Sequence, residues 1–408
     1  MIDPVASMVD AFGWETGVTM TRDVDPDIVH RTISKLLEKG MAFSVLGVTF
    51  GVLTACSGGA ESATSTSAAT STAAQPVTVA GSVVSTAGSS NETEIVVPEP
   101  IVASLTELGG SGGGVEWVSV AGDGSTSTEP IDLTGDSAAA VTGLTEQMNK
   151  LQASAPGREA LAGLAAIASP AGSPVWVFSP LLDTQGALDF NQLAFDESPP
   201  TVIKAATDAG ALPDLTGRDV TFVVAPVAGG QDPLTELQVG YQRAVWEGIA
   251  TAAGASKVTF FEGTGTAAGT GTITAVAIPD PNDKINSEQQ GATRTCTLPS
   301  PALFVPDEAT LIDKSATLTA LGECVGTLDS TTKISVGGHT AAVTGGDPAV
   351  AVDLSTRRAT EVAALLRELN VPAENIAEVV GYGDSRPLVE PATDPANRAV
   401  VVTFTSAG

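Results

Sequence analysis

The chain has 408 residues, enough for two or three domains with cores of their own. Aromatic residues make up only 4% of it, so such cores would be built mainly from Val, Leu, Ala and Ile. A formal net charge of −28 makes nucleic acids and anionic lipid headgroups poor partners, because their phosphates would be repelled. The two histidines, His30 and His339, are too few for a zinc site built from several histidines.

The first pattern in chain order is an uncharged, largely apolar run at residues 41–55, preceded by Arg31, Lys35 and Lys39. A basic start, a short apolar core and small residues before a break are typical of an export signal. A retained transmembrane helix is the alternative, but the run is shorter than the roughly 20 residues that a span requires. We therefore predict a signal peptide with an N-terminal extension over residues 1–55.

The sequence LTAC at residues 53–56 resembles the lipobox of bacterial lipoproteins. In that family the cysteine becomes the first residue and carries acyl chains such as palmitate. The resemblance implies lipidation of Cys56 and an exported protein that is anchored to the cell membrane and faces the cell wall. Residues 56–90 are rich in Ser, Thr, Ala and Gly, a composition that predicts a flexible tether.

In residues 91–281, strand-like runs alternate with helical ones, which favours an α/β domain with a mostly parallel sheet. The predicted strands lie at residues 94–97, 115–120, 175–178, 220–225, 258–261 and 272–278. The predicted helices lie at residues 138–151, 158–168, 201–211 and 234–253. The stretches VWVFSPLLDTQGALDF, LPDLTGRDVTFVVAP and YQRAVWEGIATAAGA are similar to von Willebrand factor A-like domains, which implies a Rossmann-like sheet.

Two motifs in this region suggest chemistry. Asp123, Ser125 and Ser127 have the DxSxS spacing with which von Willebrand factor A-like domains bind Mg²⁺. Since the next residues continue as an extended segment, we expect a turn between strands and no metal or cofactor.

GGSGG at residues 109–113 fits the GxSxG string of hydrolases but lacks the flanking strand and helix of a nucleophile elbow. We expect a flexible loop there and no enzymatic activity.

The chain beyond residue 281 begins with a polar stretch, residues 282–295, that we interpret as a linker. Cys296 and Cys324 follow, and an exported protein can oxidise them to a disulfide, with two buried thiols as the alternative. Patterning predicts helices at 311–328 and 355–369, the second capped by Ser355, and strands at 333–338, 376–382 and 397–404.

Four short sequences between residues 334 and 402, ISVGGHTA, LSTRRATEV, VGYGDSRP and NRAVVV, resemble the OmpA-like domain in their order and spacing. The resemblance covers the chain from Cys296 to Phe404, within a domain that we place at residues 296–408. It implies an α+β fold of βαβαββ order and non-covalent binding of peptidoglycan through the diaminopimelate of the stem peptide.

The resemblance also implies a binding pocket. Arg358 matches the arginine that binds a ligand carboxylate, and we expect it in the first turn of a helix, where free N–H groups also favour an anion. Ala341 stands where the family usually has Asp, so the acid that would face the ligand ammonium is missing. Asp347 or Asp353 could replace it.

The remaining pocket residues implied by the resemblance are Thr340, Asn397 and Arg398. His339 either shapes a loop through a hydrogen bond or contacts the ligand directly. We expect the neighbouring Arg357 to form a surface pair with Glu361, four residues further along the helix.

These patterns predict a non-enzymatic envelope lipoprotein that links the membrane to peptidoglycan, with an unknown protein partner for its α/β domain. The alternative is an adhesion or assembly module that acts through the α/β domain, with or without Mg²⁺, while the C-terminal domain only positions it.

Overall fold

The computed structural model describes residues 76–408, except for 88, 266–268, 280–284, 344–345 and 407–408. The predicted signal peptide, Cys56 and residues 56–75 of the predicted tether lie outside the described residues. Within the described part of the chain, no helix has the length and apolar character needed to cross a membrane.

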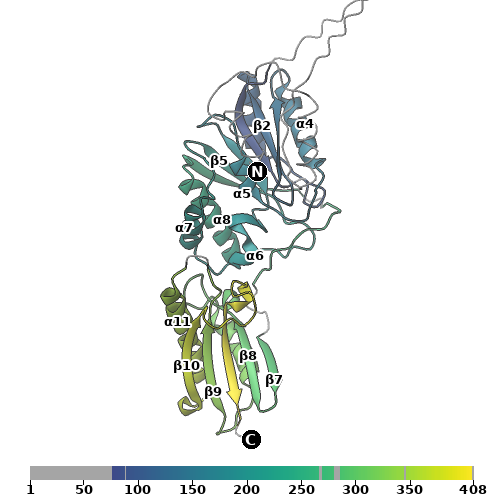
Figure 1. The fold of residues 1–408 in the computed structure, drawn as a ribbon. Coiled ribbons are helices and arrows are strands. Elements are labelled where there is room, and N and C mark those ends of the chain that lie inside the picture. The colour runs from purple at the N-terminus through teal and green to yellow at the C-terminus, as the bar shows by residue number, and fades with distance from the viewer. Residues whose placement is uncertain (1–75, 88, 266–268, 280–284, 344–345, 407–408) are drawn as a thin grey trace, which may run out of the picture. The chain divides into compact units, whose positions relative to one another are not determined.

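The first sheet contains six strands among the described residues, in the order β3-β2-β1-β4-β5-β6 (Figure 1). Neighbouring strands are parallel except in the β2–β3 hairpin. The strand order reverses between β1 and β4, which creates a topological switch point at their carboxyl ends. The strands are β1 Val79–Ser85, β2 Gly114–Val120, β3 Thr126–Asp132, β4 Val175–Ser179, β5 Asp219–Val224 and β6 Lys257–Glu262.

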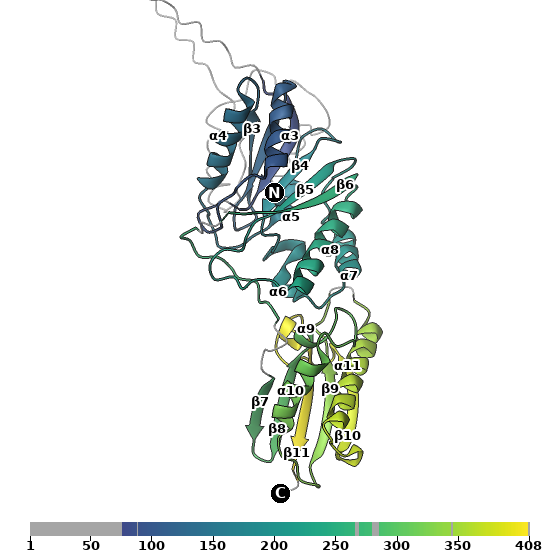
Figure 2. The same ribbon diagram turned by 180° about the vertical axis from the view of Figure 1, so that it is seen from behind.

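Helices cover both faces of this sheet (Figure 2). Val83 and Trp117 belong to one core with α3 and α4, whereas Val84 and Val118 belong to another with α5, α7 and α8. This alternation is what a strand buried on both faces requires. The helices are α3 Glu99–Gly110, α4 Ser137–Asn149, α5 Ala160–Ala165, the short α6 Phe190–Leu193 after the 3₁₀ turn η1 (Gly186–Leu188), α7 Pro199–Asp208 and α8 Glu236–Ala252.

Strand β1 lies inside the segment predicted as tether, so the tether prediction is wrong for residues 79–85. The small side chains that suggested a spacer are the ones that fit in β1, because neighbouring side chains pack closely against this strand. The Ser82 hydroxyl donates to the Glu116 carboxylate over 2.7 Å. A Cβ atom on Gly81 would lie 2.9 Å from the Trp176 ring.

Two further predicted strands, residues 94–97 and 272–278, are irregular and pair with no strand among the described residues. Side-chain amides satisfy their backbones instead. The Asn149 side chain accepts from the Ile95 N–H over 2.7 Å, and the Gln231 side chain accepts from the Val276 N–H over 2.7 Å. Hydrogen bonds to side chains therefore replace part of the strand pairing in these segments.

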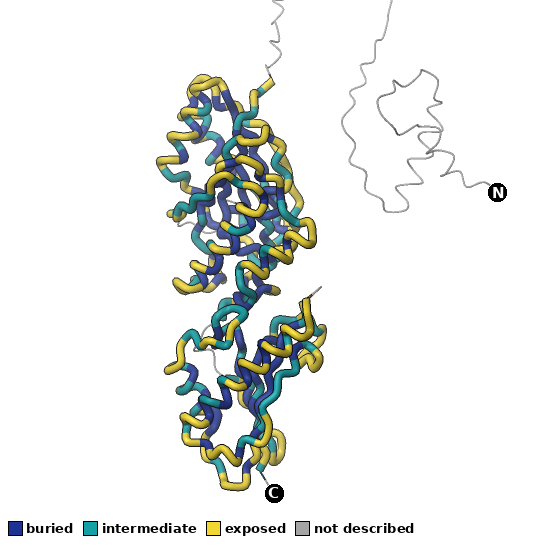
Figure 3. The backbone as a smooth tube through the Cα atoms, turned by 90° about the vertical axis from the view of Figure 1, so that its left-hand side faces the viewer, coloured by how far each residue is buried: buried dark blue, intermediate teal, exposed yellow. Residues whose placement is uncertain are grey.

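The second sheet has the order β10-β9-β11-β8-β7. Its strands are β7 Asn286–Gln290, β8 Thr293–Pro299, β9 Lys333–His339, β10 Ile376–Gly383 and β11 Ala399–Thr405. Its helices are α9 Ser300–Leu303, α10 Lys314–Val325 and α11 Pro348–Glu368, with 3₁₀ turns η2 (Ala373–Asn375) and η3 (Pro395–Asn397). Figure 3 shows that the buried residues gather in the interior of the described chain. The edge strands β3 and β7 are almost entirely exposed.

The predicted linker at residues 282–295 is wrong in part, because β7 and the start of β8 lie within it. β7 is an exposed edge strand of polar residues, which is why its sequence resembles a linker. The predicted disulfide is confirmed: Cys296 of β8 is bonded to Cys324 of α10, with 6.5 Å between their Cα atoms.

Candidate functional site around Arg358

Helix α11 begins at Pro348, and the side chain of Asp347 caps it by accepting from the Ala349 N–H over 2.9 Å. The predictions that Ser355 caps this helix and that Arg358 lies in its first turn are therefore wrong. An Asp followed by Pro is a strong helix start, since Pro at the first position loses no hydrogen bond. The free N–H groups of the helix start do not contribute to binding at Arg358.

Ser355 is instead a buried contact between α11 and the sheet. Its hydroxyl accepts from the Gly383 N–H over 3.0 Å. A Cβ atom on Gly338 of β9 would lie 2.0 Å from the Ser355 carbonyl oxygen, so the helix rests directly on the strand backbone. This close packing fixes the rotation of α11 and with it the direction of Arg358.

Arg358 is fully buried, and its guanidinium binds a carboxylate of the α/β domain. Nη2 donates to Oδ1 of Asp196 over 2.7 Å, and Nη1 donates to Oδ2 over 3.0 Å. Nε donates to the Glu308 carbonyl over 2.8 Å, and the guanidinium carbon lies 5.2 Å from the Phe304 ring centroid. This is the bidentate geometry with which arginine binds carboxylates.

Asp196 is presented by the short connection between α6 and α7. Ala194 and Phe195 have φ values of 51° and 56°, the left-handed region that non-glycine residues rarely adopt. The Phe195 ring packs against Tyr241, with 5.3 Å between the ring centroids. The Asp196 carbonyl accepts from the Asp307 N–H over 2.9 Å. The aromatic packing and this hydrogen bond hold the carboxylate on Arg358, and both sheets belong to one compact unit, Ala73–Gly408.

A second ion pair lies beside the first. Arg398 donates from Nη2 to Glu197 over 2.7 Å and from Nη1 to the Gln192 carbonyl over 2.6 Å. Its Nε lies 3.9 Å from Asp196 Oδ2. Burial raises the pKa of Glu197, and the positive charge of Arg398 opposes that shift.

Asp307 completes this set of contacts, which joins the α6–α7 connection to the loops of the C-terminal domain. Its Oδ2 atom accepts from the Ser198 N–H over 3.0 Å and from the Thr201 hydroxyl over 2.7 Å. Three carboxylates, of Asp196, Glu197 and Asp307, therefore lie close to two guanidinium groups.

The two acids predicted to compensate for Ala341 are engaged elsewhere. Asp347 caps α11, and Asp353 accepts from Arg357 Nε over 2.9 Å. The predicted Arg357–Glu361 pair is therefore wrong, because Arg357 turns toward the preceding helical turn. The acid that contacts Arg358 is Asp196.

The other predicted pocket residues lie near the strand ends of the second sheet. His339 makes a loop-shaping hydrogen bond from Nδ1 to the Arg386 carbonyl over 2.8 Å, and burial lowers its pKa. The Thr340 hydroxyl is buried and has no partner among the described residues. The buried Asn397 amide accepts from the Leu388 and Val389 N–H groups and so supports their loop.

Two grooves adjoin the Arg358 site. One has a volume of about 800 Å³ and is lined by residues that include Phe195, Tyr241 and Glu308. The Tyr241 hydroxyl has no partner within the described residues, and burial raises the Tyr241 pKa. The other groove has a volume of about 680 Å³, and its lining includes Glu197 and Arg398.

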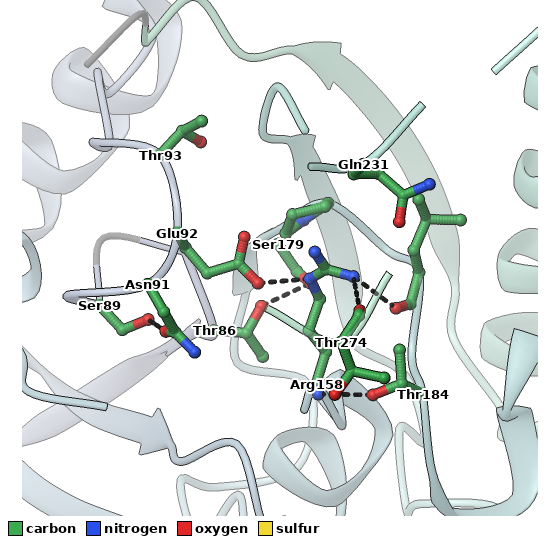
Figure 4. A network of polar contacts seen from close by, with 12 residues as sticks. Thr86, Ser89, Asn91, Glu92, Thr93, Arg158, Ser179, Thr184, Gln231 and Thr274 are labelled. Carbon is green, nitrogen blue, oxygen red and sulfur yellow. Dashed lines mark hydrogen bonds and ion pairs between the residues drawn. The ribbon is translucent and has the colours of Figure 1, made fainter. Parts of the chain in front are cut away.

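A separate polar cluster lies at the switch point of the first sheet (Figure 4). Arg158 forms a buried ion pair with Glu92, and its Nη1 reaches the Thr274 carbonyl over 3.4 Å. The Thr86 hydroxyl at the end of β1 donates to the Ser179 hydroxyl at the end of β4 over 2.6 Å. Burial raises the pKa of Glu92, and the charge of Arg158 opposes this. Side chains of the protein itself therefore lie where such sheets hold a ligand, beside a pocket of about 260 Å³.

The DxSxS string lies in the β2–β3 hairpin, as the predicted turn requires. The Asp123 carboxylate accepts from the backbone N–H and the hydroxyl of Ser125, over 3.0 and 2.6 Å. In the described residues, no three His, Cys, Asp or Glu side chains gather where they could hold a metal ion. The glycine-rich residues 109–113 span the end of α3 and the turn before β2.

Sequence reasoning missed Asp196, Glu197 and Asp307. The dipeptide at 196–197 follows a short helix and precedes two prolines, and nothing in this pattern identifies a partner 162 residues away. Arg358 was identified because its motif is local.

Residues 303–400 match the OmpA family, which confirms the predicted OmpA-like domain. No similar protein was found among curated sequences. The periplasmic domain of Helicobacter pylori MotB is 19% identical over 30% of this chain and 82% of that structure, with a TM-score of 0.26. The cell wall anchor of the T6SS from Pseudomonas aeruginosa is 19% identical over 30% and 89%, with a TM-score of 0.25. The OmpA-like domain of FopA1 from Francisella tularensis is 20% identical over 31% and 88%, with a TM-score of 0.24.

Proposed function

We propose that this chain is a non-enzymatic envelope lipoprotein that links a membrane to peptidoglycan through its C-terminal domain. The observation that carries the proposal is the OmpA-family match at residues 303–400, which contains Arg358. The arginine that the family resemblance assigns to a ligand carboxylate binds a carboxylate bidentately in this structure. The Arg358 side chain is therefore positioned to bind a carboxylate.

The ligand that the resemblance implies, the diaminopimelate end of a stem peptide, carries an ammonium group as well as carboxylates. We assign the complementary anion to Asp307 rather than to position 341. Its N–H binds the backbone of Asp196, so it lies beside the carboxylate held by Arg358. Its Oδ2 now accepts from Ser198 and Thr201, the kind of donors that an ammonium group would replace.

The lipobox-like sequence at Cys56 supports attachment to the membrane through acyl chains, with the protein facing the wall. Two acyl chains give stable anchoring where one does not. The strand order of the first sheet supports a relationship to von Willebrand factor A-like or other doubly wound domains. Because the ion pair of Glu92 and Arg158 lies at its switch point, we assign this domain to spacing and protein interaction.

The test is co-sedimentation of the full chain with diaminopimelate-type sacculi. We expect Arg358→Ala to lower the affinity about tenfold or more, since charge-assisted hydrogen bonds contribute about 1.5–3 kcal/mol. The matched control is Arg357→Ala, which removes an exposed neighbouring arginine whose ion-pair partner within the described residues is Asp353. Equal sedimentation of the Arg358 variant and the wild type would contradict the proposal.

A further inference from the structure

We propose that Asp196 is an internal ligand of the Arg358 site, which the chain must release before it binds a wall peptide. The inference rests on the proposed function, because it assigns the regulation of that same site. In the closed state seen here, the Asp196 carboxylate takes the place of a ligand carboxylate. In the open state, the α6–α7 connection withdraws and the site accepts an external one.

The first support is steric. Arg358 has no exposed surface, and all three of its nitrogens donate, two to Asp196 and one to the Glu308 carbonyl. These hydrogen bonds use three of the five guanidinium N–H groups, and the lack of exposed surface keeps an external carboxylate away from the other two. An external ligand must therefore displace Asp196 rather than bind beside it.

The second support is the polar character of the contact. It includes the ion pairs of Arg358 and Arg398 and the hydrogen bonds of Asp307, and open grooves of about 800 and 680 Å³ adjoin it. Polar interfaces between domains of one chain are typically reversible. Of the three carboxylates here, Asp307 pairs with no guanidinium group among the described residues and is held by hydrogen bonds at the start of α7.

The third support is the backbone that presents the carboxylate. Ala194 and Phe195 are consecutive non-glycine residues in the left-handed region. Such a conformation is unfavourable and persists only where surrounding contacts impose it. Release of Asp196 removes one of those contacts, so the connection can relax as the site opens.

The test uses the full chain and two probes, diaminopimelate-type sacculi and a soluble stem peptide that carries meso-diaminopimelate. Asp196→Asn removes the charge that binds Arg358, and we expect it to tighten binding about tenfold or more, because less of the protein is closed. Asp208→Asn is the matched control: it changes an exposed carboxylate of the same domain, paired with Lys204. The double variant Asp196→Asn/Arg358→Ala should lose the gain.

A second variant tests the proposal independently, in case Asp196→Asn misfolds. Thr201→Val removes a hydrogen bond to Asp307 from the partly exposed start of α7 and leaves the Arg358 pair in place. We expect a smaller increase in affinity. In the wild type, the stem peptide should also speed amide hydrogen exchange in residues 190–198, because binding frees that segment.

The outcomes separate the two proposals. Equal affinities of the wild type and Asp196→Asn, both dependent on Arg358, would refute the proposal that Asp196 is an internal ligand. The proposal of wall binding would stand. No binding by any variant, Asp196→Asn included, would overturn the proposed function and this inference with it. Tighter binding by Asp196→Asn but not by Asp208→Asn would support both.

Discussion

Asp183 has no exposed surface, and its carboxylate accepts hydrogen bonds from the Ala160 and Leu161 N–H groups at the start of α5. Burial is the main cause that raises its pKa, to about 7, and the two hydrogen bonds oppose it. An acid whose pKa is higher in the folded protein than in the unfolded chain favours folding when protonated. Its contribution is therefore fully present at acidic pH and is lost as the pH rises.

Replacement of Asp183 by Asn, which cannot titrate, tests this. We expect the unfolding free energy of the wild type, relative to Asp183→Asn, to fall as the pH rises from about 4 to above about 7. Chemical denaturation of both proteins at a series of pH values measures the difference. A difference independent of pH would show that the carboxyl does not titrate in this range.

The Glu92–Arg158 pair at the switch point allows a second prediction for single residues. Arg158→Met should destabilise the protein by about 3–5 kcal/mol, because it leaves Glu92 buried without a positive partner. The double variant Glu92→Gln/Arg158→Met should recover part of the loss, since neither position then carries a buried charge. Calorimetric unfolding of the three proteins provides the measurement; a double variant no more stable than Arg158→Met would refute the explanation.

At the scale of elements, the sequence predicted α8 and α4 well, because their apolar residues recur at helical spacing, but it placed the start of α11 at residue 355 instead of Pro348. The helix predicted at residues 234–253 corresponds to α8, Glu236–Ala252, and the helix predicted at residues 138–151 corresponds to α4, Ser137–Asn149. Strand β1 was missed, because its small residues reflect tight packing against Trp176 rather than flexibility. Composition alone does not distinguish these two causes.

The contact between α11 and β9 is the element-scale feature most sensitive to substitution. Gly338→Ala would place a methyl group 2.0 Å from the Ser355 carbonyl oxygen, so the helix would have to move. We expect a loss of about 1–3 kcal/mol in stability. We also expect weaker wall binding, because Arg358 lies one turn after Ser355 in α11 and would move with the helix. Thermal unfolding and sedimentation would measure the two effects.

Gly322→Ala in α10 is the control for this prediction. Its nearest neighbour would be a Leu369 methyl at 3.5 Å, an ordinary contact. Because glycine costs a helix interior about 0.5–1 kcal/mol relative to alanine, this variant should be as stable as the wild type or slightly more so. Similar destabilisation by both substitutions would refute the special role of Gly338.

At the scale of the whole molecule, motifs and alternation predicted the order of an α/β domain and an OmpA-like domain. The boundaries were less predictable: the first sheet starts before residue 91 and the second before residue 296. Both errors arose where strands are polar or built from small residues. The pairing of Asp196 with Arg358 was beyond sequence reasoning, because it depends on how two domains meet.

The covalent link between Asp196 and its partner site has one more consequence. A ligand on the same chain acts at a high effective concentration, which reaches the millimolar range for short flexible connections. Under the proposed competition, dilute soluble fragments of the wall would be outcompeted by the chain itself. An intact sacculus presents many stem peptides at one place, and it could hold the site open. The protein would thus discriminate assembled wall from its debris.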